Sequence, residues 1–361
     1  MEVVSKDSTL HMRKGTVYPG IDGLRTFAAI GIVLMHIKSN VNYQIDGVLL
    51  NTIIDNFAPL VSLFFIISGF SMCCGYYESI KSGSISLNEF YKKRYMRSLP
   101  VFAILVLIEV LYGGLGKQSI FEGIADVTLV FSFLPKSDIS VVGVGWTLGI
   151  IFAFYILFPF YVFLIWNKRR AFASLFLSLF FTYACETFFL LNGQIATHNI
   201  LLWMSFFVSG GIIYLYKDKI TSWINKRYVI YLFITIFILV IRYIQPSLFG
   251  MEFDMFYRLL GDCALLILAI SCKSVIKMIL VNPITKFISS ISLEIYLAHM
   301  FVFRFVDKMH LTQISPYNYI SYGFTCILTL AGVIVFALVI KRLFSYIAHR
   351  ISRANTKKKN D

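Results

Sequence analysis

Charged residues are scarce in this 361-residue chain, since Asp, Glu, Lys and Arg together make up only 14% of it. Hydrophobic residues make up 58%, and the mean hydropathy is +0.75. Soluble domains carry about 25% charged residues, because their surfaces face water. The composition therefore excludes a soluble enzyme, a nucleic-acid-binding protein and a secreted disulfide-bonded scaffold, and it predicts a membrane protein.

Acidic residues and paired cysteines are also few. There are 19 Asp and Glu against 33 Lys and Arg, and the net charge is +14. The basic residues lie in short clusters between apolar blocks, a distribution that orients a membrane protein rather than one that binds nucleic acid. None of the six cysteines forms a Cys-x-x-Cys pair or has a histidine at metal-ligand spacing, so we interpret them as small hydrophobic residues and expect no metal. Lipidation of the adjacent Cys73 and Cys74 is the alternative for that pair.

Ten apolar blocks, each long enough to cross about 30 Å of hydrocarbon as a helix, follow one another along the chain. They span residues 20–38, 56–77, 98–115, 144–166, 171–191, 197–216, 228–245, 257–276, 288–307 and 317–341. An eleventh segment, 120–134, is shorter, carries Glu122 and Asp126, and ends at Pro135, which favours an interfacial or re-entrant segment. The predicted fold is an all-α polytopic membrane protein with about ten transmembrane helices.

The basic clusters predict the topology. With ten spans and a cytoplasmic N-terminus, 25 of the 33 basic residues lie on the cytoplasmic side, so both termini are predicted to be cytoplasmic. We expect a cytoplasmic N-terminal tail (1–17), one transmembrane domain (18–345) and a basic C-terminal tail (346–361) that includes Lys357, Lys358 and Lys359. The first apolar block has no small-residue cleavage site, so we expect no removable signal peptide, and no soluble catalytic domain is expected after the last span.

Ionisable residues inside spans are costly and are therefore functional candidates. Arg25 and His36 are 11 residues apart, and 11 helical steps of about 100° return to within about 20° of the same face, about 16 Å farther along the axis. A neutral imidazole can accept a proton near pH 7, which suits His36 to deprotonate an attacking hydroxyl. The alternatives are that Arg25 anchors the inner surface beside Asp22 and that His36 makes an interhelical hydrogen bond.

Three further pairs have helical spacing. Arg94 and Arg97 precede the third span at i and i+3, and their guanidinium groups suit a phosphate or pyrophosphate, although topological charge is the alternative. Tyr296 and His299 lie one turn apart and place a second imidazole in the membrane, with a buried packing contact as the alternative. Arg258 and Asp262, at i and i+4, predict a structural ion pair.

Taken together, these residues resemble the acyltransferase family 3 membrane proteins, which decorate bacterial surface glycans. The resemblance covers roughly residues 18 to 345 and rests on Gly20-Ile21-Asp22-Gly23-Leu24-Arg25 with His36, Phe64-Phe65-Ile66-Ile67-Ser68-Gly69-Phe70, Arg94-x-x-Arg97, Gly145-Trp146-Thr147-Leu148, Phe154-Tyr155-Ile156-Leu157-Phe158-Pro159 and Tyr296-Leu297-Ala298-His299. Each motif is weak alone, whereas their order along the chain is typical of the family.

The resemblance implies acyl transfer across a bacterial cytoplasmic membrane. Acyl-CoA in the cytoplasm, most often acetyl-CoA, would donate its acyl group to a hydroxyl of a cell-surface polysaccharide or its lipid-linked precursor. His36 would then be the essential histidine and Arg25 its partner, while Arg94 and Arg97 would hold the CoA phosphates. His299, Tyr296 and Trp146 are candidates on the acceptor side, because aromatic faces stack on sugars.

One departure from the family and several alternatives remain. Many relatives carry one or two Glu residues after the Trp-Ser/Thr-Leu motif, whereas this chain has Ile151 and Phe152. The residues do not separate His36 as general base from His36 as transient acyl acceptor. Either the membrane domain completes transfer itself, or a separate extracytoplasmic transferase or the glycan-synthesis machinery is a partner that does so. The competing functions are a polysaccharide or acyl-carrier flippase without bond chemistry, and an assembly factor that tolerates substitution of His36 and the arginines.

Overall fold

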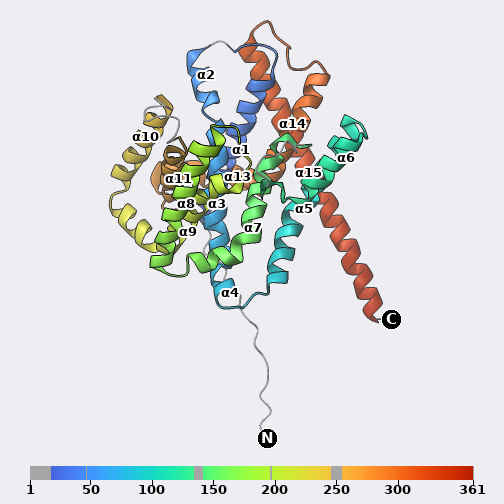
Figure 1. Cartoon of the computed structure of the whole chain (residues 1–361). Helices are drawn as coiled ribbons and strands as arrows, with labels where there is room; N and C mark the ends of the chain where they lie inside the picture. The colour runs from blue at the N-terminus through green and yellow to red at the C-terminus, as the bar shows by residue number, and fades with distance from the viewer. Residues whose placement is uncertain (1–17, 46, 134–140, 196, 245–253, 361) are drawn as a thin grey trace.

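The computed structural model describes residues 18–45, 47–133, 141–195, 197–244 and 254–360. Within these ranges every regular element is helical, which confirms the predicted all-α fold (Figure 1). The predicted N-terminal tail (1–17), Pro135 and the side chains of Lys357, Lys358 and Lys359 lie outside the described part of the chain.

Seven helical stretches in the described ranges are long and apolar enough to cross a membrane. Four of them are single helices: α1 (Pro19–Asn40), α5 (Leu87–Gly113), α9 (Ile200–Lys226) and α15 (Asn318–Asn360). A fifth is made of five consecutive elements, namely α2 (Val48–Asp55), η1 (Ala58–Leu60), α3 (Val61–Met72), η2 (Cys73–Tyr77) and α4 (Glu78–Lys81). The last two are η4 (Gly143–Gly145) with α7 (Trp146–Leu164), and α8 (Lys168–Ala184) with η5 (Cys185–Leu190).

Two further spans are strongly bent. α11 (Asp254–Ile270) meets α12 (Ser274–Leu280) at 96°, and α13 (Pro283–Ser290) meets α14 (Ser292–Lys308) at 69°. With these pairs the number of spans rises to as many as nine, and α10 (Tyr228–Ile244) is a shorter apolar helix. Each of the ten predicted blocks overlaps a helix of the described chain, but blocks 257–276 and 288–307 each run through a sharp bend. The count of ten spans and the cytoplasmic side of both termini stay predictions. α6 (Lys117–Thr128) and η3 (Phe131–Phe133) are not among the spans, in keeping with an interfacial or re-entrant segment.

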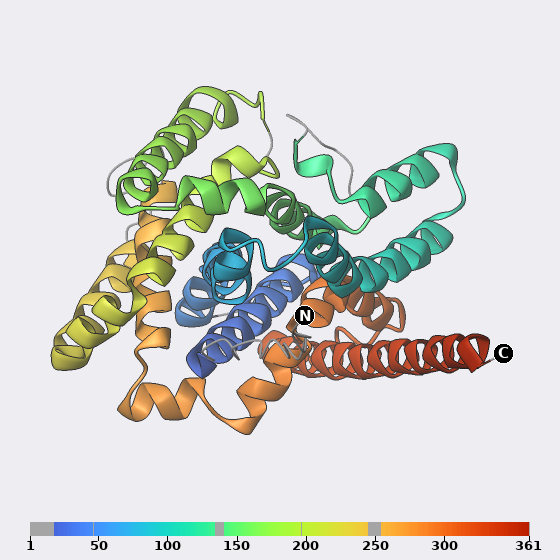
Figure 2. The ribbon, with the colours of Figure 1, turned by 90° about the horizontal axis from the view of Figure 1, so that it is seen from below.

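α1 and α3 lie in the middle of the bundle, and the other helices surround them (Figure 2). α3 packs most closely on α9, because Gly69 and Gly210 face each other's helices at the crossing. A Cβ atom on Gly69 would overlap the Phe207 carbonyl oxygen, and one on Gly210 would overlap the Ile66 carbonyl oxygen. Small residues at a helix crossing allow this close backbone approach in membranes.

The end of α1 that carries Arg25 is held by the bent segment α12–α13. Asn282 caps α13 by accepting a hydrogen bond from the Thr285 backbone N–H, while the Thr285 hydroxyl accepts one from the Asn282 N–H. The Thr26 hydroxyl of α1 donates to the Thr285 carbonyl oxygen at 2.8 Å. Gly23 lies directly against Leu280 of α12. The first two turns of α1 therefore rest on a segment that runs across the direction of the spans.

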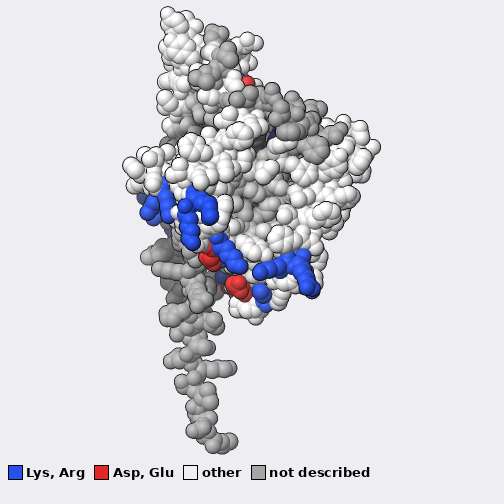
Figure 3. Space-filling model, turned by 90° about the vertical axis from the view of Figure 1, so that its left-hand side faces the viewer, with Lys and Arg blue, Asp and Glu red and all other residues white. Residues whose placement is uncertain are grey.

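Charge is distributed unevenly over the surface. On the face shown in Figure 3, Lys and Arg gather in the lower half, at the end of the bundle where α4 lies in Figure 1, and the upper half is almost free of charge. Large apolar side chains such as Phe176 (75% exposed) and Phe237 (64% exposed) lie on the outside of α8 and α10. Exposed phenylalanine on a helix bundle suits lipid rather than water, and the charge asymmetry is typical of a membrane protein.

The predicted ion pair between Arg258 and Asp262 is wrong. The Arg258 guanidinium instead pairs with Asp254, four residues earlier on α11, at 2.5 Å. Asp262 is buried and accepts a hydrogen bond from the Ser62 hydroxyl of α3. Asp254 and Asp262 are each four residues from Arg258, so spacing alone allowed an ion pair with either. The packing of α11 on α3 directs the Asp262 side chain away from Arg258.

Candidate active site

Two histidines from distant parts of the chain meet between α1 and α14. The rings of His36 and His299 lie with their centroids 5.1 Å apart at an angle of 40°. His299 is fully buried, and its Nδ1 atom lies 2.7 Å from the Tyr296 carbonyl oxygen. A carbonyl oxygen only accepts hydrogen bonds, so Nδ1 carries the proton and Nε2 keeps its lone pair. Among the described residues, Nε2 has no hydrogen-bond partner, which leaves a proton-accepting atom buried beside His36.

Tyr296 separates this histidine pair from the Arg25 end of α1. Its hydroxyl shares a buried 2.5 Å hydrogen bond with the Thr147 hydroxyl at the start of α7. Its ring lies edge-on to Phe64 of α3 at 5.6 Å and tilted against His299 at 6.0 Å. Tyr296 therefore links α3, α7 and α14 next to the imidazole of His299.

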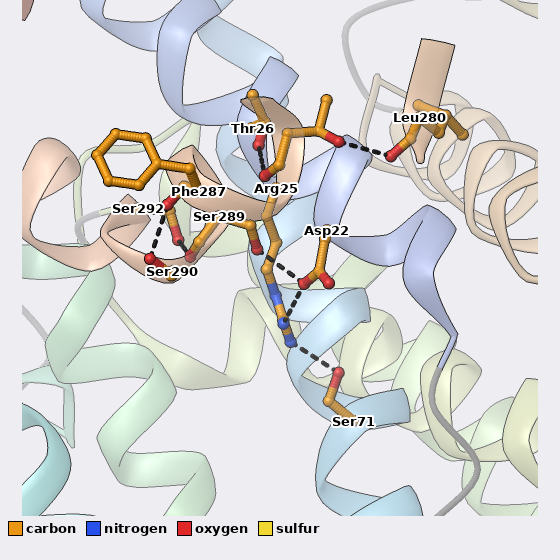
Figure 4. A network of polar contacts seen from close by, with 10 residues as sticks. Asp22, Arg25, Thr26, Ser71, Leu280, Phe287, Ser289, Ser290 and Ser292 are labelled. Atoms are coloured by element: carbon orange, nitrogen blue, oxygen red, sulfur yellow. Dashed lines mark hydrogen bonds and ion pairs between the residues drawn. The ribbon is translucent and has the colours of Figure 1, made fainter. Parts of the chain in front are cut away.

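Arg25 lies at the centre of the polar network shown in Figure 4. Its Nη2 atom donates to the Ser71 hydroxyl at 2.8 Å, and its Nη1 atom lies 3.8 Å from Asp22, so the predicted pairing with Asp22 is present. Asp22 in turn accepts a 2.8 Å hydrogen bond from the Ser289 hydroxyl of α13. Side chains from α3 and α13 thus fix the guanidinium.

Arg94 and Arg97 both lie on α5, yet their side chains occupy different surroundings. The Arg94 guanidinium lies 4.6 Å from the ring centroid of Tyr76 and 5.7 Å from that of Tyr155, and it donates to the Tyr76 hydroxyl at 2.6 Å. Its Nε atom is buried, and no described residue accepts a hydrogen bond from it. Arg97 is exposed, and its charge interacts with those of Arg25 and Glu294. The helical turn is as predicted, but Arg94 is clamped between aromatic rings, whereas Arg97 is exposed.

A cavity of about 90 Å³ lies between Arg25 and Tyr296. Its walls are mainly apolar and come from α3, α7 and α14, with Phe64, Leu148 and Leu293 among them. A cation at one end, an apolar middle and, beyond Tyr296, the half-buried His36 beside the buried His299 suit a molecule with an anionic part and a small uncharged reactive group. Guanidinium groups such as those of Arg94 and Arg97 can bind phosphate through paired N–H donors.

Trp146 does not join the histidines. Its ring stacks on His198 with centroids 5.0 Å apart and also lies 6.1 Å from Trp203 of α9. Ile151, at the first position where many relatives carry Glu, lines the cavity, and Phe152 is buried with its ring 4.4 Å from that of Tyr95. In the described part of the chain, neither histidine forms an ion pair with a carboxylate, and no three His, Cys, Asp or Glu residues are grouped to hold a metal.

Ser71 and Thr147 are site residues that the search for ionisable groups missed. Both are small hydroxyl residues, which are common in membrane helices and so carry no signal of their own. Each nevertheless lies in or beside a motif, since Ser71 follows Phe64–Phe70 and Thr147 belongs to Gly145-Trp146-Thr147-Leu148. Attention to neutral residues within the motifs would have found them.

The fold and the site together define a polytopic membrane protein in which an arginine network and two neighbouring imidazoles lie at opposite ends of a small cavity. The family of acyltransferase domains matches residues 18–341, and the chain belongs to this family. It is similar to the acyltransferase MdmB of Streptomyces mycarofaciens, with 30% identity over 155 residues, which are 39% of this chain and 38% of that protein. It is also similar to the O-acetyltransferase OatA of Staphylococcus aureus, with 28% identity over 159 residues, 39% of this chain and 24% of that protein.

These matched segments cover less than two-fifths of the length of either relative. No solved structure matches the chain.

Proposed function

We propose that this protein is a membrane-bound O-acyltransferase that moves an acyl group from acyl-CoA in the cytoplasm to a hydroxyl of a cell-surface polysaccharide or its lipid-linked precursor. The donor is acetyl-CoA, and the membrane is a bacterial cytoplasmic membrane. Membership of the acyltransferase family supports the class of reaction. The observation that carries the proposal is the continuous arrangement of Arg25, the small cavity, Tyr296 and the pair His36 and His299.

The donor binds from the side of the bundle that carries the arginines. Arg25, Arg94 and Arg97 hold the anionic phosphates, and the buried Nε of Arg94, which has no partner among the described residues, is the donor best placed to gain one. The thioester then lies in the cavity between Arg25 and Tyr296. The largely apolar walls leave few polar groups that could hold a hydrolytic water beside the thioester while it waits for the acceptor.

His36 acts as the general base. It is half-buried, so a hydroxyl can reach it, and its neighbour His299 is held in one tautomer by the Tyr296 carbonyl. The imidazole takes the hydroxyl proton as the oxygen attacks the thioester carbonyl carbon, a C–O bond forms, and the C–S bond breaks. The proton then passes to the thiolate sulfur, so the products are the O-acyl ester and free CoA thiol. His299 and Tyr296 lie on the acceptor side of this step, and an extracytoplasmic partner protein that completes transfer is compatible with it.

The test is proton NMR of the surface polysaccharide from a strain that lacks the gene and is complemented with defined variants. We expect O-acyl signals to vanish on deletion, to return with the wild type and to stay absent with His36→Ala, since loss of a general base costs about 10²- to 10⁴-fold in rate. His310→Asn is the matched control, because His310 is exposed at the end of α14. Immunoblots of the membrane fraction show that each variant is present.

The same experiment examines the arginines. Arg94→Ala/Arg97→Ala removes two positive charges and is expected to abolish O-acylation, whereas Lys92→Ala/Lys93→Ala removes two exposed charges from the same turn and is expected to preserve it. If the acylation pattern never changes while the amount or length of exported polymer falls on deletion, the protein is a flippase and the proposal is wrong.

A further inference from the structure

The cavity between Arg25 and Tyr296 is lined by large apolar side chains from three helices. Phe64 comes from α3, Leu148 and Ile151 from α7, and Leu293 from α14. The Phe64 ring lies edge-on against Tyr296, and Leu148 is only 3% exposed, so the Leu148 side chain cannot move without repacking the bundle. Ile151 and Leu293 are half-buried and complete the wall from opposite helices.

The volume of the cavity limits what it can hold. An apolar cavity of about 150 Å³ accommodates one benzene molecule, or roughly 25 Å³ for each non-hydrogen atom. The cavity here measures about 90 Å³, which corresponds to between three and four such atoms. An acetyl group has three non-hydrogen atoms, a propionyl group four and a butyryl group five.

We infer that this cavity is the acyl-binding pocket and that Ile151 and Leu293 set the length of the transferred chain, with acetyl accepted, propionyl at the limit and longer groups excluded. This inference rests on the proposed acyltransferase function and adds the pocket that holds the acyl group and the residues that limit its length. The position supports it, because an acyl group in the cavity lies between Arg25, which holds the donor's anionic part, and Tyr296, which contacts His299.

Chemistry supports it as well. The middle of an acyl chain has neither charge nor hydrogen-bonding groups, so it needs the apolar wall that Phe64, Leu148, Ile151 and Leu293 provide. A carboxylate at position 151 would give the wall a charge, whereas isoleucine gives it a methyl-bearing surface. Close-packed walls resist expansion, and one extra methylene in a fitted apolar pocket changes specificity by roughly 10- to 200-fold.

The experiment compares acetyl-, propionyl-, butyryl- and hexanoyl-CoA as donors for the purified full-length protein in proteoliposomes. The acceptor is the polysaccharide fraction of the strain that lacks the gene. CoA release gives kcat/KM for each donor, and mass spectrometry of the polysaccharide identifies the ester. We expect the wild type to prefer acetyl over butyryl by at least about 100-fold, since two methylenes separate them.

Ile151→Ala and Leu293→Ala each remove three carbons and so open about 75 Å³ from opposite walls. In each variant we expect the ratio of butyryl to acetyl kcat/KM to rise at least tenfold while acetyl transfer persists. Two independent variants keep the test decisive if one of them does not fold, which size-exclusion chromatography reveals. Ile327→Ala is the matched control, because Ile327 is 67% exposed on α15 and its loss should leave the donor profile unchanged.

The outcomes separate the two proposals. If the wild type forms no ester from any donor, the acyltransferase function itself fails. If the wild type transfers acetyl groups but both folded variants keep the wild-type donor profile, the function stands and the assignment of the pocket is overturned. The assignment is also overturned if the wild type uses butyryl- or hexanoyl-CoA as well as acetyl-CoA, because the cavity would then not limit the length of the acyl chain.

Discussion

Replacing Ser71 with alanine removes one oxygen atom from the site and isolates the contribution of Arg25. The Ser71 hydroxyl accepts a 2.8 Å hydrogen bond from the Arg25 guanidinium. The second contact of that guanidinium, with Asp22, is longer at 3.8 Å, and the two side chains are 25% and 32% exposed. The two contacts therefore differ in strength, and the difference predicts the order of two variants.

The magnitudes follow from the geometry. A hydrogen bond to a charged group contributes about 1.5–3 kcal/mol, or about 10- to 150-fold in an equilibrium or rate ratio. A partly exposed ion pair contributes only about 0.2–1 kcal/mol, or about 1.4- to 5-fold, because water and salt screen it. We therefore expect Ser71→Ala to lower kcat/KM for acetyl-CoA by about 10- to 150-fold and Asp22→Asn by less than about 5-fold.

The assay measures CoA release in proteoliposomes at several acetyl-CoA concentrations, and isothermal titration with CoA measures binding. Ser71→Thr keeps the hydroxyl and should restore most of the activity. In the Arg25→Gln background, Ser71→Ala should cost nothing further, because the hydroxyl acts through the guanidinium.

Two results would refute this reasoning. One is a full additional loss when Ser71→Ala is combined with Arg25→Gln, which would show that Ser71 acts through packing. The other is a larger loss for Asp22→Asn than for Ser71→Ala, which would show that the ion pair rather than the short hydrogen bond positions Arg25.

Three further predictions concern stability in detergent. Thr147→Val leaves the buried Tyr296 hydroxyl without its partner and should lower the free energy of unfolding by about 1–3 kcal/mol. The double variant Thr147→Val/Tyr296→Phe should recover most of that loss. Thermal unfolding measures both variants, and no recovery in the double variant would argue against the hydrogen bond. Burial raises the pKa of Asp126 on α6 to about 6, although a backbone hydrogen bond from Val142 opposes this rise. The free energy of unfolding is therefore highest below about pH 4 and falls as the pH rises through 6. Asp126→Asn should therefore flatten unfolding curves measured between pH 4 and 8 and stabilise the protein at pH 7 by on the order of 3 kcal/mol, whereas an unchanged pH profile would contradict the raised pKa. Gly210→Ala should lower the free energy of unfolding by about 1–3 kcal/mol, because the added methyl group forces α9 away from a carbonyl oxygen of α3. In the control Gly323→Ala on α15, the methyl group meets nothing within 4 Å, so the free energy of unfolding should hardly change. Equal effects of the two substitutions would rule out the close crossing of α3 and α9.

Local helix geometry made part of the site predictable. Arg25 and His36 lie on one helix, so their common face follows from the 11-residue spacing, and both face the α14 side in the structure. The approach of His299 to His36 depends on how α14 packs against α1, and no local pattern reports a contact between residues so far apart in the chain. The resemblance to known motifs, rather than periodicity, brought both histidines into one hypothesis.

The sharp bends were beyond sequence reasoning for a different reason. The predicted blocks 257–276 and 288–307 leave residues 277–287, with Lys277 and Lys286, as a loop between two straight spans. In the structure α12 and α13 instead run across the spans, with Met278 (75% exposed) and Ile284 (72% exposed) on their outer side. Whether an apolar helix crosses or lies along a membrane depends on what it packs against, and here that is the first turns of α1.

The 69° bend between α13 and α14 separates the helix that holds the arginine end of the site from the helix that carries the imidazole end. On one side of Ile291, Ser289 of α13 holds Asp22 and through it Arg25; on the other, α14 carries Tyr296 and His299. A small rotation at this joint would change the separation of the arginine end from the imidazole end without disturbing either one internally.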